Sequence, residues 1–179
     1  NPGSYYLFDA KTNNLGFLFS SRSWIKPSQM AITKPINFTA RDGLAIYGYL
    51  TIPNNAEEKN LPLVVMPHGG PHGPRDWWGY DSTAQLLASR GIAVLKVNFR
   101  GSGGFGRNFE RAGHRKWGQE IQYDIIDGVK YLISSGIADK GNICIMGASF
   151  GGYSALQSAI LEPGMFQCAI GVVGVYDLP

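Results

Sequence analysis

The stretch from Asn142 to Leu161 constrains the fold more than any other part of the chain. It opens with a short apolar run at 142–146, passes through a glycine-rich segment at 147–152 and continues with apolar residues at helical spacing. The sequence Glu162-Pro163-Gly164 ends the helical pattern, because proline lacks an amide hydrogen and glycine readily leaves the helical region. The stretch therefore predicts a buried strand, a tight turn and a helix.

The turn in this stretch, Gly147-Ala148-Ser149-Phe150-Gly151, fits the pattern G-x-S-x-G. When a nucleophile is held on a strained bend between a strand and a helix, the neighbouring backbone leaves no room for a Cβ atom two residues either side. Ser149 is therefore the candidate nucleophile. The N–H of Phe150 opens the helix without an internal partner, and it is the candidate donor to an oxyanion. The alternative is a turn of small residues that only packs a helix against a sheet.

The composition is that of a soluble globular domain. The chain has 179 residues, of which 44% are hydrophobic and 16% charged, enough for one ordinary core. The net charge of +3 does not dictate a partner, and a nucleic-acid surface would need more charge with stacking aromatics. No apolar run reaches the ~18 residues of a membrane span. We therefore expect neither a nucleic-acid nor a membrane partner.

The two cysteines, Cys144 and Cys168, each lie inside an apolar run. We expect buried free thiols there, not a disulfide, and no metal-ligand spacing is present. No signal segment opens the chain, which starts without a methionine and resembles a piece of something longer. The compartment stays open, with the cytoplasm slightly favoured, and we expect no metal and no cofactor.

The N-terminal third of the chain predicts two β-hairpins. The first pairs 5–9 with 15–19, and we expect it to belong to a larger sheet or to pack on the residues after it, because a lone hairpin is barely stable. The second pairs 36–40 with 44–52 around an Asp-Gly turn. An irregular segment at 20–34 is expected to link them.

From Leu63 onward, apolar runs typical of strands alternate with helical patterns. Strands are expected at 61–66, 92–99, 142–146 and 168–176, and helices at about 81–89, 120–135 and 153–161. This alternation predicts the α/β class, with a doubly wound, mostly parallel sheet covered on both faces.

A second glycine motif, His68-Gly69-Gly70-Pro71, follows the strand predicted at 61–66. The C-terminal ends of parallel strands gather ligand sites, and paired glycines let the backbone turn an N–H toward the same oxygen as that of Phe150. The N–H of Gly70 is our candidate for the second oxyanion donor, and a plain turn is the alternative. His68 is expected to be a structural hydrogen-bonding group, not a base. Trp77 and Trp78 are candidates to wall an acyl pocket, with packing an equal alternative.

The segment Gly101-Ser102-Gly103-Gly104-Phe105-Gly106 matches G-x-G-x-x-G, so a dinucleotide site has to be considered. A fingerprint loop opens a helix at once. Here we expect 107–118 to intervene before the strong helical pattern, and we reject a dinucleotide site on that ground. The loop is expected to buttress the rim of the active site.

Together these motifs resemble the prolyl oligopeptidase family of serine peptidases, nearest its acylaminoacyl-peptidase branch. The segments that carry the resemblance are 68–74, 98–106 and 147–153. It covers about Lys34 to Pro179 and implies an α/β-hydrolase domain, truncated before the last strands of its sheet. It also implies that 1–33 are the tail of a preceding β-propeller and a linker, and that 34–179 are the N-terminal part of the peptidase domain.

The resemblance implies that Ser149 attacks the carbonyl carbon of a short peptide while the N–H groups of Gly70 and Phe150 hold the oxyanion. Relatives in the prolyl-cleaving branches carry a tyrosine for that role where this chain has His68. The triad of α/β-hydrolases runs serine, acid, histidine. After Ser149 this chain has only Glu162 and Asp177 as acids and no histidine. We therefore expect the acid and the base to lie outside the chain, which should have little or no activity alone.

Three functions fit these features. The favoured one is a serine peptidase that hydrolyses short peptides through an acyl-enzyme. The second is a carboxylesterase of the same fold, which would use the same three residues. The third is a non-catalytic, hydrolase-like interaction module. We also expect self-association through the sheet edge at 168–176.

Overall fold

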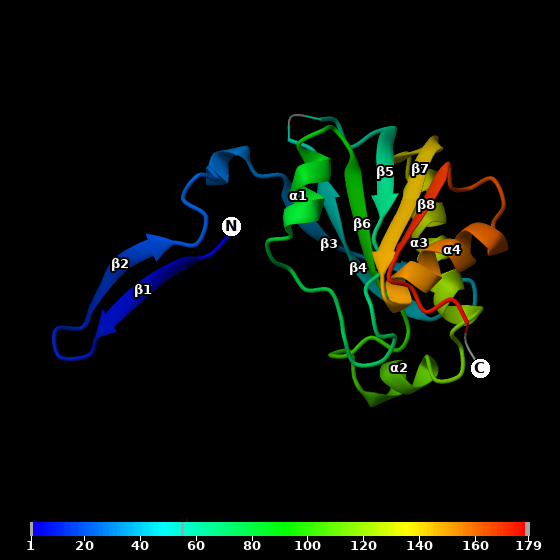
Figure 1. The fold of residues 1–179 in the computed structure, drawn as a ribbon, viewed down its shortest axis with the longest axis horizontal. Coiled ribbons are helices and arrows are strands. Elements are labelled where there is room, and N and C mark those ends of the chain that lie inside the picture. Colours follow the sequence, from blue (N-terminus) through cyan, green and yellow to red (C-terminus); the bar gives the residue numbers. More distant parts are fainter. Residues whose placement is uncertain (1, 55, 178–179) are drawn as a thin grey trace.

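The computed structural model describes residues 2–54 and 56–177, which form a two-stranded hairpin and a six-stranded sheet with helices (Figure 1). The hairpin consists of β1 (Ser4–Asp9) and β2 (Asn14–Ser20). The strands of the large sheet are β3 (Ile32–Thr39), β4 (Ala45–Ile52), β5 (Leu61–Val65), β6 (Ala93–Asn98), β7 (Ala138–Ala148) and β8 (Cys168–Val172). The helices are η1 (Pro27–Gln29), α1 (Ser82–Ala88), α2 (Arg107–Ala112), α3 (Glu120–Ser134) and α4 (Phe150–Leu161).

The order of strands in the large sheet is β3-β4-β6-β5-β7-β8. The pairs β3–β4 and β4–β6 are antiparallel, whereas β5–β6, β5–β7 and β7–β8 are parallel. The prediction of an α/β class with a mostly parallel sheet is therefore confirmed, and the antiparallel part comes from the predicted second hairpin.

Helices cover both faces of this sheet, as the alternation of side chains along β6 shows. Val97 lies against α3, since a Cβ atom on Gly128 of that helix would stand 3.2 Å from its Cγ2 atom. The next side chain toward the start of β6, Lys96, instead pairs with Asp81, the N-cap residue of α1. Successive side chains of a strand point to opposite faces, so α1 and α3 lie on opposite sides. The helix α4 packs against α3, β7 and β8.

The first hairpin stands apart from the large sheet (Figure 1). Its pairing confirms the predicted strands, although large apolar side chains on both faces, such as Leu7 and Phe8, remain more than half exposed. A two-stranded ribbon has no second layer with which to bury them. The predicted irregular link is also shorter than expected, because β3 already begins at Ile32.

A buried ion pair fastens the end of β6 to α3. The guanidinium of Arg100 donates to both carboxylate oxygens of Asp124, at 2.8 and 2.7 Å, and also to Asp42 in the β3–β4 turn. The Asp124 side chain is fully buried. These two carboxylates raise the pKa of Arg100 above its already high value, so the guanidinium stays charged.

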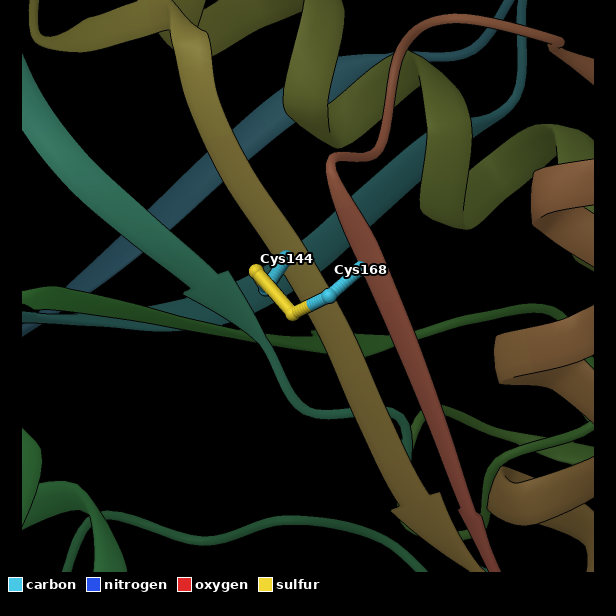
Figure 2. The surroundings of a disulfide bond; sticks show 2 residues. All are labelled: Cys144 and Cys168. Atoms are coloured by element: carbon cyan, nitrogen blue, oxygen red, sulfur yellow. A yellow bond between two sulfur atoms is a disulfide. The ribbon is translucent and has the colours of Figure 1, made fainter.

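The expectation of two free thiols is wrong. Cys144 on β7 and Cys168 on β8 form a disulfide bond (Figure 2). The side chain of Cys168 is also exposed, not buried. The two residues are direct partners in the register of the parallel pair, with their Cα atoms 4.7 Å apart, a distance that a disulfide can bridge. The strand register brings the two cysteines together. Because they are 24 residues apart in the sequence, no local pattern indicated that they would pair.

No helix in the described part of the chain is long and apolar enough to cross a membrane.

Candidate active site

Ser149 occupies the turn between β7 and α4 in a conformation that residues other than glycine rarely adopt. Its φ and ψ angles are 56° and −125°, and the residue is exposed. Its N–H donates to the carbonyl of Val172 on β8 at 3.0 Å, and its own carbonyl accepts from Gly152 and Tyr153. Backbone strain of this kind costs about 1–3 kcal/mol and is concentrated at functional sites. The structure thus confirms the predicted strand, sharp turn and helix.

The glycines beside Ser149 are required by close backbone contacts. A Cβ atom on Gly147 would lie 2.4 Å from the carbonyl oxygen of Gly151, and one on Gly151 would lie 2.1 Å from that of Pro67. Both distances are far inside van der Waals contact. The turn can therefore form only with glycine at these positions. This is the steric reason for the glycines that the G-x-S-x-G pattern led us to expect.

The segment that follows β5 runs past this turn. A Cβ atom on Gly69 would stand 3.5 Å from the Cβ atom of Ser149, so the backbone of Gly69 lies directly beside the candidate nucleophile. Gly70 has a φ of 138°, which favours glycine, and its bond to Pro71 is cis. Because β5 and β7 are parallel neighbours, the segments that follow them meet at one edge of the sheet.

His68 fixes the orientation of the peptide between Gly69 and Gly70. Its Nδ1 atom lies 2.7 Å from the carbonyl oxygen of Gly69, which only accepts, so Nδ1 carries the proton and donates. Its Nε2 atom accepts from the hydroxyl of Ser102 at 2.9 Å. In a trans peptide the carbonyl and the next N–H point in opposite directions. The hydrogen bond that holds the Gly69 carbonyl therefore also aims the Gly70 N–H.

The surroundings of His68 keep it neutral. Burial lowers the pKa of its imidazole, an effect that the hydrogen bond to Gly69 and the carboxylate of Asp76 oppose only in part. The ring also stacks on Phe99, with centroids 4.2 Å apart. Its two hydrogen bonds and this stacking fit the predicted role as a structural hydrogen-bonding group.

The glycine-rich loop at 101–106 packs against the segment that carries Gly70. The N–H of Gly73 donates to the carbonyl of Gly101 at 3.2 Å, and a Cβ atom on Gly103 would lie 2.1 Å from the carbonyl oxygen of Gly73. The strong helical pattern begins at Glu120, as expected, but the short helix α2 starts immediately after Gly106, so the absence of a helix directly after the loop is no longer an argument against a dinucleotide site. Gly101 and Gly103 nevertheless allow close contacts with the segment at 71–73, which fits a loop that supports that segment.

Trp77 and Trp78 line a cavity that does not include the turn of Ser149. Both are more than 60% exposed, and the indole of Trp78 donates to the carbonyl of Thr33. They line this cavity, of about 710 Å³, together with residues that include Arg22 and Tyr80. None of the residues that line this cavity belongs to the segments at 67–74 or 147–151. The structure therefore gives no support to an acyl pocket walled by these two residues.

The described residues hold no base for Ser149. None of the side chains in 2–54 and 56–177 forms a hydrogen bond with its hydroxyl, and the three histidines all precede it in the sequence. Glu162 ends α4 and pairs with Lys130 on the surface. Within the same ranges no group of three metal-ligating side chains is present.

A serine on a strained turn between a parallel strand and a helix, beside a glycine segment from the neighbouring strand, matches the turn on which α/β-hydrolases carry their nucleophile. The family model "Prolyl oligopeptidase family" matches residues 78–179. The chain belongs to this family, which confirms the resemblance seen in its motifs.

Relatives and solved structures agree with this assignment. The chain is 38% identical over 184 residues to dipeptidyl aminopeptidase BIII of Pseudoxanthomonas mexicana, a match that covers 99% of the chain and 27% of the relative. A puromycin-hydrolyzing peptidase of Mycobacterium tuberculosis superposes with a TM-score of 0.85 at 28% identity, over 99% of this chain and 28% of the other. For the acylaminoacyl peptidase of Pyrococcus horikoshii the TM-score is 0.79 at 28% identity, over 98% and 28% of the two chains. The chain thus spans little more than a quarter of these proteins.

Proposed function

We propose that this chain supplies the nucleophile and the oxyanion donors of a serine peptidase that hydrolyses short peptides. The observation that carries the proposal is the strained Ser149 beside the Gly69–Gly70 peptide. The family adds support, because relatives and structural neighbours are named as dipeptidyl, acylaminoacyl and puromycin-hydrolyzing peptidases.

In this reaction the Oγ atom of Ser149 attacks the peptide carbonyl carbon while a histidine takes its proton. The carbonyl oxygen becomes an oxyanion, which accepts hydrogen bonds from the N–H groups of Gly70 and Phe150. The histidine then protonates the departing amine, and water hydrolyses the ester that remains on Ser149. No histidine follows Ser149 here, so we propose that the acid and the base come from sequence outside this chain.

Phe150 is suited to the second donor role by its position. It is the first residue of α4, where an N–H has no carbonyl one turn earlier to accept from it. Its ring is almost fully buried and packs against Phe99 and Tyr153. This packing fixes the backbone at the start of the helix without using the N–H itself.

Labelling with a fluorophosphonate tests the proposal. In a form of the protein that includes a histidine C-terminal to Ser149, we expect stoichiometric labelling of Ser149, located by mass spectrometry. The 179-residue chain alone should label slowly or not at all, because a serine without a base is a weak nucleophile. A folded long form that stays unlabelled would favour the non-catalytic module.

A second comparison separates a peptidase from the carboxylesterase alternative. A peptide amide and an ester with the same acyl group would be offered to the same preparation. A peptidase cleaves both, since its histidine can protonate the amine as it leaves. Cleavage of the ester but not of the amide would show that the protein is a carboxylesterase.

Removing the His68 side chain should weaken catalysis through the backbone. We expect His68→Ala to lower kcat by about 10²–10³-fold, the usual cost of one lost oxyanion donor, because the Gly70 N–H is no longer aimed. His68→Asn keeps a donor for the Gly69 carbonyl and should recover much of the rate. Equal losses in both variants would show that the Gly69 hydrogen bond is not what matters.

We also propose that the chain associates with itself through β8, which pairs with β7 on one side only among the described strands. Ile170 and Val172 on this strand are nearly half exposed. An unpaired apolar edge is a template for another strand. Light scattering that reports a monomer across a wide range of concentrations would contradict this.

A further inference from the structure

His72 lies in the same segment as Gly70 and is hydrogen-bonded to Trp117, which is 45 residues further along the chain. The indole Nε1 of Trp117 donates to the Nε2 atom of His72 at 2.9 Å. The other ring nitrogen, Nδ1, is buried and has no partner in the described part of the chain. Gly101 leaves room for this ring, since a Cβ atom there would lie 2.9 Å from Nδ1.

The chemistry of this bond fixes the protonation state of His72. An indole N–H can only donate, so Nε2 must be unprotonated to accept from it. The neutral ring then carries its single proton on Nδ1. An imidazolium has N–H on both nitrogens and cannot accept at all. Only neutral His72 can make the observed hydrogen bond.

Trp117 connects His72 to the start of α4. Its ring stands edge-on to that of Phe150, with centroids 6.2 Å apart. Its carbonyl accepts from the buried side chain of Gln122 on α3 at 2.7 Å, which anchors its backbone. Trp117 thus contacts two parts of the candidate site. It bonds to His72, in the segment of Gly70, and it packs against Phe150, the second candidate oxyanion donor.

We propose that the hydrogen bond between His72 and Trp117 is a pH-sensitive clamp that holds the two oxyanion donors, Gly70 and Phe150, in place relative to each other. It is closed when His72 is neutral and open when His72 is protonated. His72 is a positioning residue in this scheme, because it acts through Trp117 and not on the substrate. The clamp rests on the proposed function, since the donors serve an oxyanion only in a hydrolase.

The groups that face His72 favour the closed state at neutral pH. Burial lowers its pKa, and so does the nearby His114, whose exposed ring lies 4.7 Å away between centroids. Glu110 on α2 acts in the opposite direction but more weakly. A lowered pKa means that the folded protein binds this proton less readily than the unfolded chain. The clamp should therefore open only as the pH falls below the ordinary histidine value of 6.5.

Nuclear magnetic resonance of the indole N–H groups tests the clamp directly. The chain has four tryptophans, and Trp117→Phe identifies the signal of Trp117. Between pH 8 and pH 5 we expect that signal alone to shift toward the position of a free indole, with a midpoint below 6.5. In His72→Gln the amide oxygen can accept the indole N–H at every pH, so the shift should vanish.

His114→Gln is the matched control. It removes an exposed neighbour that makes no bond to Trp117, so the titration should persist with its midpoint moved upward. A Trp117 signal that does not titrate would overturn the clamp. So would one that titrates in the same way in His72→Gln.

The effect on the site is measured as the ratio of fluorophosphonate labelling rates at Ser149 in the wild type and in His72→Gln, in a form that carries the base. Protonation of that base affects both proteins and cancels in the ratio. Between pH 8 and pH 5 the ratio should fall by up to ~100-fold, since small misplacements of catalytic groups cost that much. A constant ratio would contradict the clamp, whereas absence of labelling in both proteins would refute the proposed function instead.

Discussion

Replacing Ser149 with alanine is expected to lower kcat for peptide hydrolysis by about a million-fold, the order seen when a serine peptidase loses its nucleophile. Without the Oγ atom no acyl-enzyme forms, and the oxyanion donors alone supply only a small part of the rate. The substitution leaves the strained backbone as it is and removes no hydrogen bond of the side chain among the described residues. The temperature of unfolding should therefore hardly change.

The control for this variant is Ser154→Ala, one turn further along α4. The hydroxyl of Ser154 is buried and without a partner in the described part of the chain, so its removal should leave kcat nearly unaltered. Both proteins would be compared by kcat and KM on one short peptide. A Ser149→Ala protein that retains a tenth or more of the wild-type kcat would exclude Ser149 as the nucleophile.

The substitution Asp124→Asn is expected to destabilise the fold by about 3–5 kcal/mol, the usual cost of removing one partner from a buried ion pair. The guanidinium of Arg100 would remain in the interior with only the more exposed Asp42 to balance its charge. The Arg100 backbone N–H, which also donates to Asp124, would lose a charged acceptor. Urea-induced unfolding measures the difference.

A matched change on the surface is Glu58→Gln, which breaks the pair between Lys34 and Glu58. Both side chains are nearly half exposed, so we expect a loss of no more than about 1 kcal/mol. If the free energy of unfolding fell by similar amounts in the two variants, the Arg100–Asp124 pair would not stabilise the fold more than a surface ion pair does.

The features that the sequence predicted correctly depend mainly on residues close together along the chain. The strand, turn and helix around Ser149 follow from apolar spacing and from Gly147, where an added Cβ atom would meet the backbone of Gly151 four residues later. The parallel sheet follows from the alternation of strands and helices, and α3 agrees with its predicted bounds to within one residue.

The features that were missed depend on partners far apart in the sequence. The disulfide requires the register of β8 against β7, which no local pattern specifies. The partners of His68 and His72 lie 34 and 45 residues away, so the roles of Ser102 and Trp117 had no signal in the sequence. The hydrogen bond from Trp78 to Thr33 spans 45 residues, so the surroundings of Trp78 likewise had no local signal in the sequence.

The central claim is that one hydroxyl is presented to two backbone amides. A crystal structure of the protein with a phosphonate bonded to Ser149 measures this directly. We expect one phosphonyl oxygen to lie about 2.7–3.1 Å from the nitrogens of both Gly70 and Phe150. A phosphonate attached elsewhere, or an oxygen at Ser149 that neither amide reaches, would contradict the account.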